Sequence, residues 1–123
     1  MTTTNEKIRR RYETGETLND GAPGNVATDA PANAADTVVA EDADVQAVTA
    51  DGTNTVDLSN AAAEGRQVTV VHNGGANTPK LSFTDADFVG TGPANMTAAG
   101  ATATVRNIDG TASGWVVVAT GSA

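Results

Sequence analysis

Short runs in which apolar and polar residues alternate begin at residue 37 and continue almost to the end of the chain. In the clearest run, 66–73, Val68, Val70 and His72 fall on one face of a strand. Similar patterns predict strands over 37–40, 44–50, 53–58, 80–83, 101–107 and 114–119. Turns rich in Gly and Asn separate them every eight to twelve residues or so. This spacing predicts an all-β sandwich or prism, and the lack of long crossover helices argues against a parallel αβ architecture.

The alternation also predicts which side chains face the core. Val45, Ala47 and optionally Val48 are expected to point inward from 44–50, and Val56 and Leu58 from 53–58. The uninterrupted apolar run at 115–119 predicts a last strand that is buried on both faces. The expected core of the subunit is Val68, Val70, Leu81, Phe83, Val105, Trp115 and Val117.

The first 35 residues lack this alternation. Thr3 and Glu6 have the spacing of a capping box, and Gly15 is a stop signal, so a short helix is possible within 1–13. Residues 14–35 are rich in Gly, Pro, Asn and Asp, which is typical of an extended linker. We therefore expect an N-terminal anchoring arm and linker at 1–35 and a β-domain at 36–123.

Bulky apolar residues are scarce. Leu, Ile, Val and Phe together make up less than the roughly 20% below which a highly charged chain is usually disordered. Ala and Val supply most of the apolar content, and they bury less area per residue than larger side chains do. A compact monomer is expected to be marginally stable, which favours subunits that share a core.

Charge divides the chain into regions. It has 15 acids and 7 bases, and eleven acids without a single base lie between Tyr12 and Gly65. This excess argues against general nucleic-acid binding. Asp outnumbers Glu and Arg outnumbers Lys, which is typical of halophilic archaea, although an ordinary acidic bacterial protein remains the alternative. The basic N-terminal tip is expected to dock on an acidic protein surface through Lys7, Ile8, Arg9, Arg10, Arg11 and Tyr12.

Candidate chemistry is sparse. The chain has no Cys and a single His, His72, so a zinc site lacks ligands and a structural role is favoured for His72. Asp85 and Asp87 are candidates for weak binding of Ca²⁺ or Na⁺, with a solvated acidic surface as the alternative. Phosphate-cradle and nucleophile-elbow motifs are missing, so we expect no enzyme and no other cofactor. Neither a signal peptide nor a membrane-spanning run is recognised, which predicts synthesis in the cytoplasm and no membrane partner.

The stretch from Val45 to Ala119 resembles the β-rich knob modules of tailed-virus capsid decoration proteins and of head and tail fibre proteins. In that pattern a strand ends near Asn-Gly, a β segment and a small-residue segment follow, and a turn leads to a terminal Trp-x-Val strand. The places are filled by Gly65, Asn73, Gly74, Leu81, Phe83, Val105, Gly110, Trp115 and Val117. The resemblance implies a β-rich knob, commonly a homotrimer, that is attached to a virion by its N-terminal part; a pentamer is also possible.

The chain is short, and we recognise no repeated shaft segment in it. The resemblance therefore favours a capsid decoration or turret protein over a fibre, located on the outer capsid surface or tail of a haloarchaeal virus. Its expected partners are copies of itself and a major capsid or other virion protein. The alternative is a fibre or adhesin module that binds a host glycan or protein through the loops at 73–79 and 84–95, with Asn77 and Phe88 as contacts.

Overall fold

The all-β prediction is confirmed. The computed structural model describes residues 25–33, 35–40 and 43–122. Their strands are β1 (Val26–Asp29), β2 (Thr37–Val39), β3 (Val45–Asp57), β4 (Gln67–Phe83), β5 (Thr102–Asn107) and β6 (Trp115–Gly121), with two 3-10 turns, η1 (Ser59–Ala61) and η2 (Asp85–Asp87). The short helix predicted within 1–13 lies outside the described residues.

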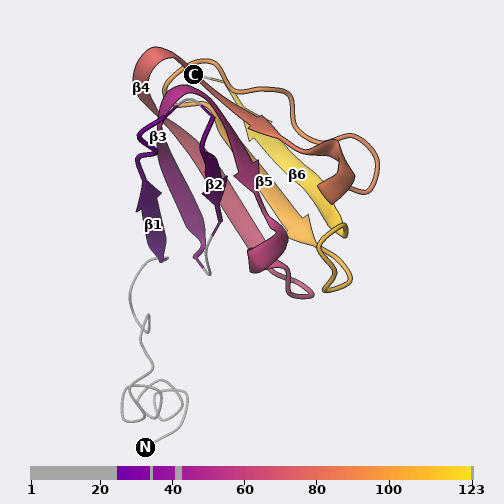
Figure 1. The fold of residues 1–123 in the computed structure, drawn as a ribbon. Coiled ribbons are helices and arrows are strands. Elements are labelled where there is room, and N and C mark those ends of the chain that lie inside the picture. Colours follow the sequence, from indigo (N-terminus) through magenta and orange to yellow (C-terminus); the bar gives the residue numbers. More distant parts are fainter. Residues whose placement is uncertain (1–24, 34, 41–42, 123) are drawn as a thin grey trace, which may run out of the picture.

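The strands form two layers because β3 and β4 are long and bend over on themselves (Figure 1). Their first halves lie beside β1 in one layer, where Val26 is in register with Val45, and Val45 with Thr69. Their second halves lie beside β2 in the other layer, where Thr37 is in register with Thr55, and Thr55 with Ser82. All of these pairs are parallel. Residues 26–39, 45–57 and 67–83 are therefore three stacked coils of a short β-solenoid.

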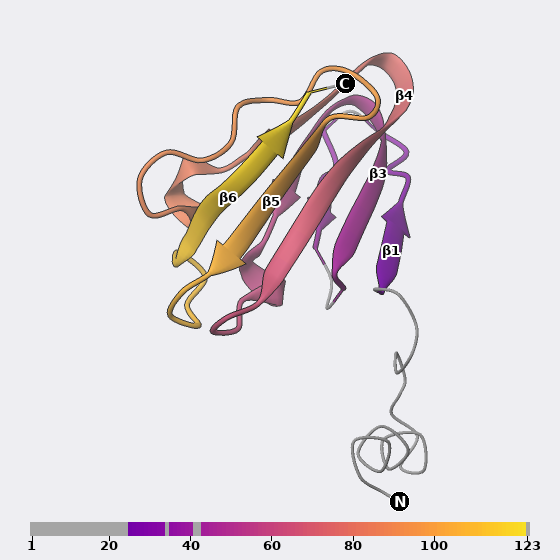
Figure 2. The ribbon, with the colours of Figure 1, turned by 180° about the vertical axis from the view of Figure 1, so that it is seen from behind.

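Strands β5 and β6 close one end of the stack. Seen from behind, β1, β3, β4, β5 and β6 follow one another across a single layer (Figure 2). β5 is antiparallel to β4, and β6 is antiparallel to β5. In the other layer the backbone of Met96 exchanges two hydrogen bonds of 2.9 Å with that of Leu81. The third coil is therefore capped by β5 in one layer and by the backbone of Met96 in the other.

The parallel pairing arises without any crossover helix. The lack of such helices in the sequence argued against a parallel αβ architecture, and here each return connection is instead a strand of the opposite layer. No repeat was recognised in the sequence, yet the coils repeat in space. Their lengths differ, and few positions carry the same residue in all three coils, which explains why the repeat was not recognised.

The predicted strands at 44–50 and 53–58 are one strand, β3, and its predicted inward face was wrong at the start. Gln46, Val48 and Ala50 are buried, whereas Val45 and Ala47 are half-buried on the other face. The even-numbered positions continue inward to Val56 and Leu58, as predicted for that part of the chain. Gln46 is tolerated inside because its Nε2 donates to Asp29 Oδ2 at 2.8 Å.

The predicted strands at 66–73 and 80–83 are likewise the two halves of β4. The last strand is not buried on both faces, which corrects the prediction made from its apolar run. Trp115 is fully buried, but β6 lies at the edge of its layer and Val118 is 53% exposed. Sequence composition alone does not distinguish a central apolar strand from one at an edge.

The core lies between the two layers of a single chain. The predicted core residues Val68, Val70, Leu81, Val105 and Trp115 are fully buried, while Phe83 and Val117 pack against them and are partly buried. A single chain already encloses these side chains. The core predicted to be shared between subunits stays a prediction.

The β-domain begins earlier in the chain than residue 36. Strand β1 belongs to the predicted arm, yet Val26–Asp29 pairs along its whole length with β3. Only four residues long and followed by Pro31, it offered too little alternation to be recognised.

Candidate interaction surfaces

Most of the described acids lie on the side of the stack where the strands begin and finish, which is not the end that β5 and β6 close. The described residues include nine acids and three bases. The strand directions place six of the acids at the end where β3 and β4 begin and where their returning halves finish (Figure 1). We call this the acidic end, and it consists of Asp44, Asp57, Glu64, Asp85, Asp87 and Asp109.

Two carboxylates at the acidic end have shifted pKa values. Partial burial, with a smaller contribution from the negative charge of Asp57, raises the pKa of Asp87, while the backbone N–H of Leu58 opposes the shift. Hydrogen bonds from the backbone N–H and hydroxyl of Thr111, at 2.9 and 2.7 Å, lower the pKa of Asp109. The charge of Asp87 is therefore unfavourable in the folded state, whereas that of Asp109 helps to hold its loop.

We expect Asp87→Asn to stabilise the protein at neutral pH by less than about 1 kcal/mol, since solvent screens a partly exposed carboxylate. A raised folded pKa means that Asp87 favours folding when protonated, and that this contribution is lost as pH rises through the folded pKa. The gain should therefore be present at pH 7 and vanish below the ordinary carboxyl pKa of about 3.8. Urea denaturation at pH 7 and pH 3 measures it. Asp85→Asn is the matched control, and an equal gain at both pH values would contradict the assignment.

The predicted docking residues, Lys7, Ile8, Arg9, Arg10, Arg11 and Tyr12, lie outside the described residues. Of the two oppositely charged regions, the structure therefore describes only the acidic end and not the basic tip. Among the described residues, no helix is long and apolar enough to cross a membrane.

His72 braces a corner of the solenoid. It is fully buried, its Nδ1 accepts from the backbone N–H of Gly74 at 3.0 Å, and its Nε2 lies 3.2 Å from the carbonyl oxygen of Pro79. These contacts fix the tautomer with the proton on Nε2. The imidazole joins both sides of the 73–79 corner, and both ring nitrogens are occupied by this structural role.

The other buried polar side chains have comparable roles. Asn107 accepts from the backbone N–H groups of Asp109 and Gly110 and donates to the carbonyl oxygen of Thr111 at 2.8 Å, which shapes the β5–β6 loop. Asn54 joins the corners of the first two coils. Each of these side chains supports a turn.

Asp85 and Asp87, the candidate cation ligands, both belong to η2. Asp85 Oδ1 accepts from the backbone N–H of Gly92 at 3.3 Å. Within the described part of the chain, no three His, Cys, Asp or Glu side chains are grouped closely enough to hold a metal ion. Weak cation binding at this pair stays a prediction.

The two loops predicted to contact a glycan do not present the expected side chains. Phe88 is only 6% exposed and packs edge-on against Phe83, with the two ring centroids 6.2 Å apart. It is therefore not available for stacking on a sugar. Asn77 is exposed, but its amide donates to Asp51 across the corner of the second coil. The expected role of Phe88 as a surface contact was therefore wrong.

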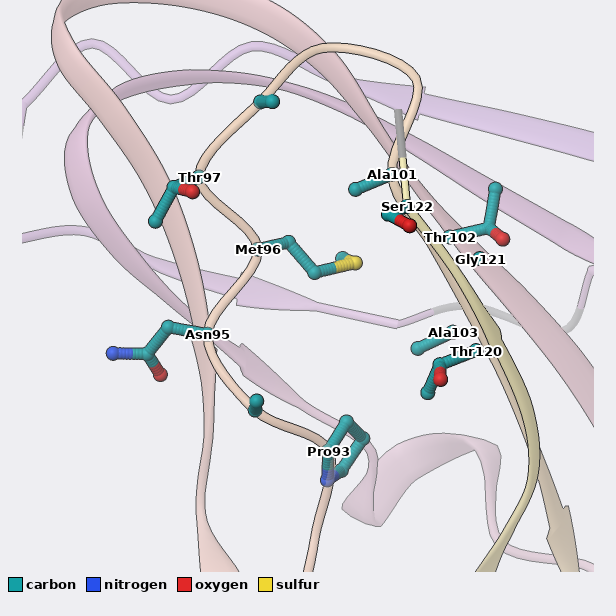
Figure 3. A pocket seen from close by; sticks show the side chains of 12 residues that line it. Pro93, Asn95, Met96, Thr97, Ala101, Thr102, Ala103, Thr120, Gly121 and Ser122 are labelled. Atoms are coloured by element: carbon teal, nitrogen blue, oxygen red, sulfur yellow. The ribbon is translucent and has the colours of Figure 1, made fainter.

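A pocket of about 370 Å³ opens where the two layers meet beside β6 (Figure 3). The Met96 side chain points into it, whereas those of Asn95 and Thr97 point away from it. Ala101 and Ala103 contribute a buried apolar floor, and Thr120 and Ser122 also line the pocket. The residues that line the pocket are Pro93, Ala94, Asn95, Met96, Thr97, Ala98, Ala101, Thr102, Ala103, Thr120, Gly121 and Ser122.

The pocket lies in the least charged part of the molecule. From Phe88 to Ser122 the only charged residues are Arg106 and Asp109, and both lie toward the acidic end. We call residues 88–105 and 115–122 the neutral cap; the β5–β6 loop, 108–114, lies at the acidic end and is not part of it. The described surface thus has an acidic end, which also holds Arg66 and Arg106, and an uncharged side that contains β6 and the pocket.

Comparison with protein-family models and with curated proteins finds no match.

Sequence reasoning missed both the neutral cap and the first strand of the solenoid. The signal for the cap was present in the sequence, since 35 consecutive residues contain only two charges in a chain with 22. What the sequence did not show is that 93–98 and 120–122 lie together at one edge. That contact depends on the bend in β4, which brings Leu81 and Met96 into the opposite layer.

Proposed function

We propose that this chain is a structural protein of a virus particle, a capsid decoration or turret protein that docks through its basic N-terminal tip and self-associates through its β-domain. The separation of charge carries the proposal. Four of the seven bases lie in 7–11, whereas the described residues have nine acids and three bases. A basic tip on an acidic body fits docking to a second acidic protein, because Arg side chains pair well with carboxylates.

The architecture supports a mechanical role. Within the described part of the chain, four polar side chains are fully buried, and all four hold neighbouring strands or turns: Gln46, Asn54, His72 and Asn107. Hydroxyl pairs tie neighbouring strands on the outer faces, with Thr55 3.0 Å from Ser82 and Thr69 2.9 Å from Thr104. Such a stack resists distortion, and the resemblance of 45–119 to virion knob modules supplies the setting.

Deletion of residues 2–13 tests the docking role. We expect the truncated protein to lose at least about 90% of its co-sedimentation with particles of the virus that encodes it, because bound Arg and Lys provide most of the attraction. Its circular dichroism and thermal unfolding should match those of the full chain. A second variant replaces Lys7, Arg9, Arg10 and Arg11 by Gln and keeps the length. It separates the loss of positive charge from the loss of chain. Undiminished particle binding by both variants would contradict the docking role.

A further inference from the structure

We propose that copies of this chain meet at the neutral cap, where the outer edge of β6 and the pocket beside it form the contact surface. The occupant of this surface is a second copy of the chain. The inference rests on the self-association in the proposed function, and it names the surface through which that association occurs.

Strand β6 offers an open edge. It is the last strand of its layer, and β5 pairs with one side of it. On its outer side, the carbonyl oxygen of Trp115 accepts from the backbone N–H of Val89 at 2.8 Å. Beyond that point, no other strand of the described residues pairs with it. Open edges present backbone donors and acceptors to which another chain can add.

This edge lacks the charges that usually protect an edge strand. Residues 110–122 contain no Lys, Arg, Asp or Glu, and the neighbouring segment 88–105 contains none either. The opposite edge of the same layer is different, because β1 ends at Asp29 and lies beside Asp44, which accepts from the backbone N–H of Asn25. Two copies of a chain with a net charge of −8 oppose the fewest carboxylates when their neutral caps face one another.

Apolar surface is exposed at the same place. Val118 is 53% exposed and is the extra residue of a bulge, since Val117 pairs with Val105 and Ala119 with Thr104. The bulge interrupts the outer edge and restricts continuous pairing to about 119–122. Thr120, Gly121 and Ser122 also line the pocket over Met96. A second copy that pairs along 119–122 would therefore cover the pocket as well.

Salt should strengthen this contact. Among the described residues, the carboxylates that repel two copies lie outside the neutral cap, and molar salt screens them to within about 3 Å. The contact itself is uncharged, so screening removes repulsion without weakening attraction. We therefore expect a larger mass in 3 M KCl than in 0.15 M KCl.

A charge substitution tests the surface. Thr120→Glu places carboxylates near one another when the caps meet, and Ser113→Glu adds the same charge at an exposed site in the β5–β6 loop. We expect Thr120→Glu to weaken self-association at least ~10-fold in sedimentation experiments, because like charges across an interface are unfavourable. Ser113→Glu should assemble like the original chain. Circular dichroism verifies that both variants are folded.

A cysteine substitution provides a second test that does not add charge. The chain has no Cys, so a single Thr120→Cys or Ser113→Cys variant contains one thiol per copy. A rotation axis that passes close to a residue brings it near its own counterpart in another copy. We expect oxidation to link Thr120→Cys into covalent pairs in high salt and to leave Ser113→Cys largely unlinked.

The outcomes separate the two proposals. If the original chain has the mass of one copy at every salt concentration, both the proposed self-association and this surface are wrong. If the original chain assembles but the Thr120 variants behave like their Ser113 controls, the self-association remains and the neutral cap is wrong. Weakened assembly of Thr120→Glu together with selective linking of Thr120→Cys supports the surface.

Discussion

Gly75→Ala is expected to destabilise the protein by at least about 4 kcal/mol, because the backbones of β3 and β4 meet at this residue. A Cβ at Gly75 would lie 1.8 Å from the carbonyl oxygen of Ala50, and its φ of +143° is rarely adopted by other residues. Since the obstacle is backbone, a side-chain rotation does not relieve it. The two strands would have to separate where both bend from one layer to the other.

Guanidinium or urea denaturation followed by tryptophan fluorescence measures this effect, since Trp115 is the only Trp and is fully buried. Gly65→Ala is the matched control. Gly65 also has a positive φ, of +87°, but a Cβ added there would have nothing within 4 Å of it. This substitution should cost only about 1 to 2 kcal/mol, the ordinary penalty for a left-handed conformation. Equal losses for the two variants would mean that the close approach at Gly75 is unimportant.

The strands were predictable from sequence because local alternation sets them, whereas their arrangement depends on the corners. Every even-numbered residue of β3 from Gln46 to Val56 is buried, including Gly52 and Asn54. Two polar residues and a glycine at inward positions concealed that continuity. A prediction that allowed a buried Asn at a corner would have joined the two expected strands into one.

The interaction surfaces were less predictable for a different reason. Charge is visible in the sequence, so the acidic excess and the basic tip were recognised at once. The acidic end, however, collects residues from 44 to 109, and the neutral cap joins 93–98 to 120–122. Such groupings follow from the number of coils and from where the stack is closed. Neither is encoded in a local pattern.

The side chain of Asn54 adds to the strand pairing that stacks the first coil on the second. This residue is fully buried at the corner of the second coil. Its Nδ2 donates to the carbonyl oxygens of Asn33 and Asp36 in the first coil, both at 2.9 Å. Its Oδ1 accepts from the backbone N–H of Asp51 at 2.8 Å. A single amide thus fixes the corner of the second coil and joins it to the first coil.

We expect Asn54→Ala to destabilise the protein by about 3 kcal/mol, since it removes three hydrogen bonds worth roughly 1 kcal/mol each and leaves their backbone partners without this side chain. Hydrogen exchange should show a local consequence, with the amides of β1 and β2 losing more protection than those of β5 and β6. Asn95→Ala, at an exposed position in the loop before β5, is the matched control and should change stability by less than about 0.5 kcal/mol. If Asn54→Ala lowered protection evenly across all strands, Asn54 would be supporting the whole core. Protection lost selectively in β1 and β2 identifies it as the connection between the first two coils.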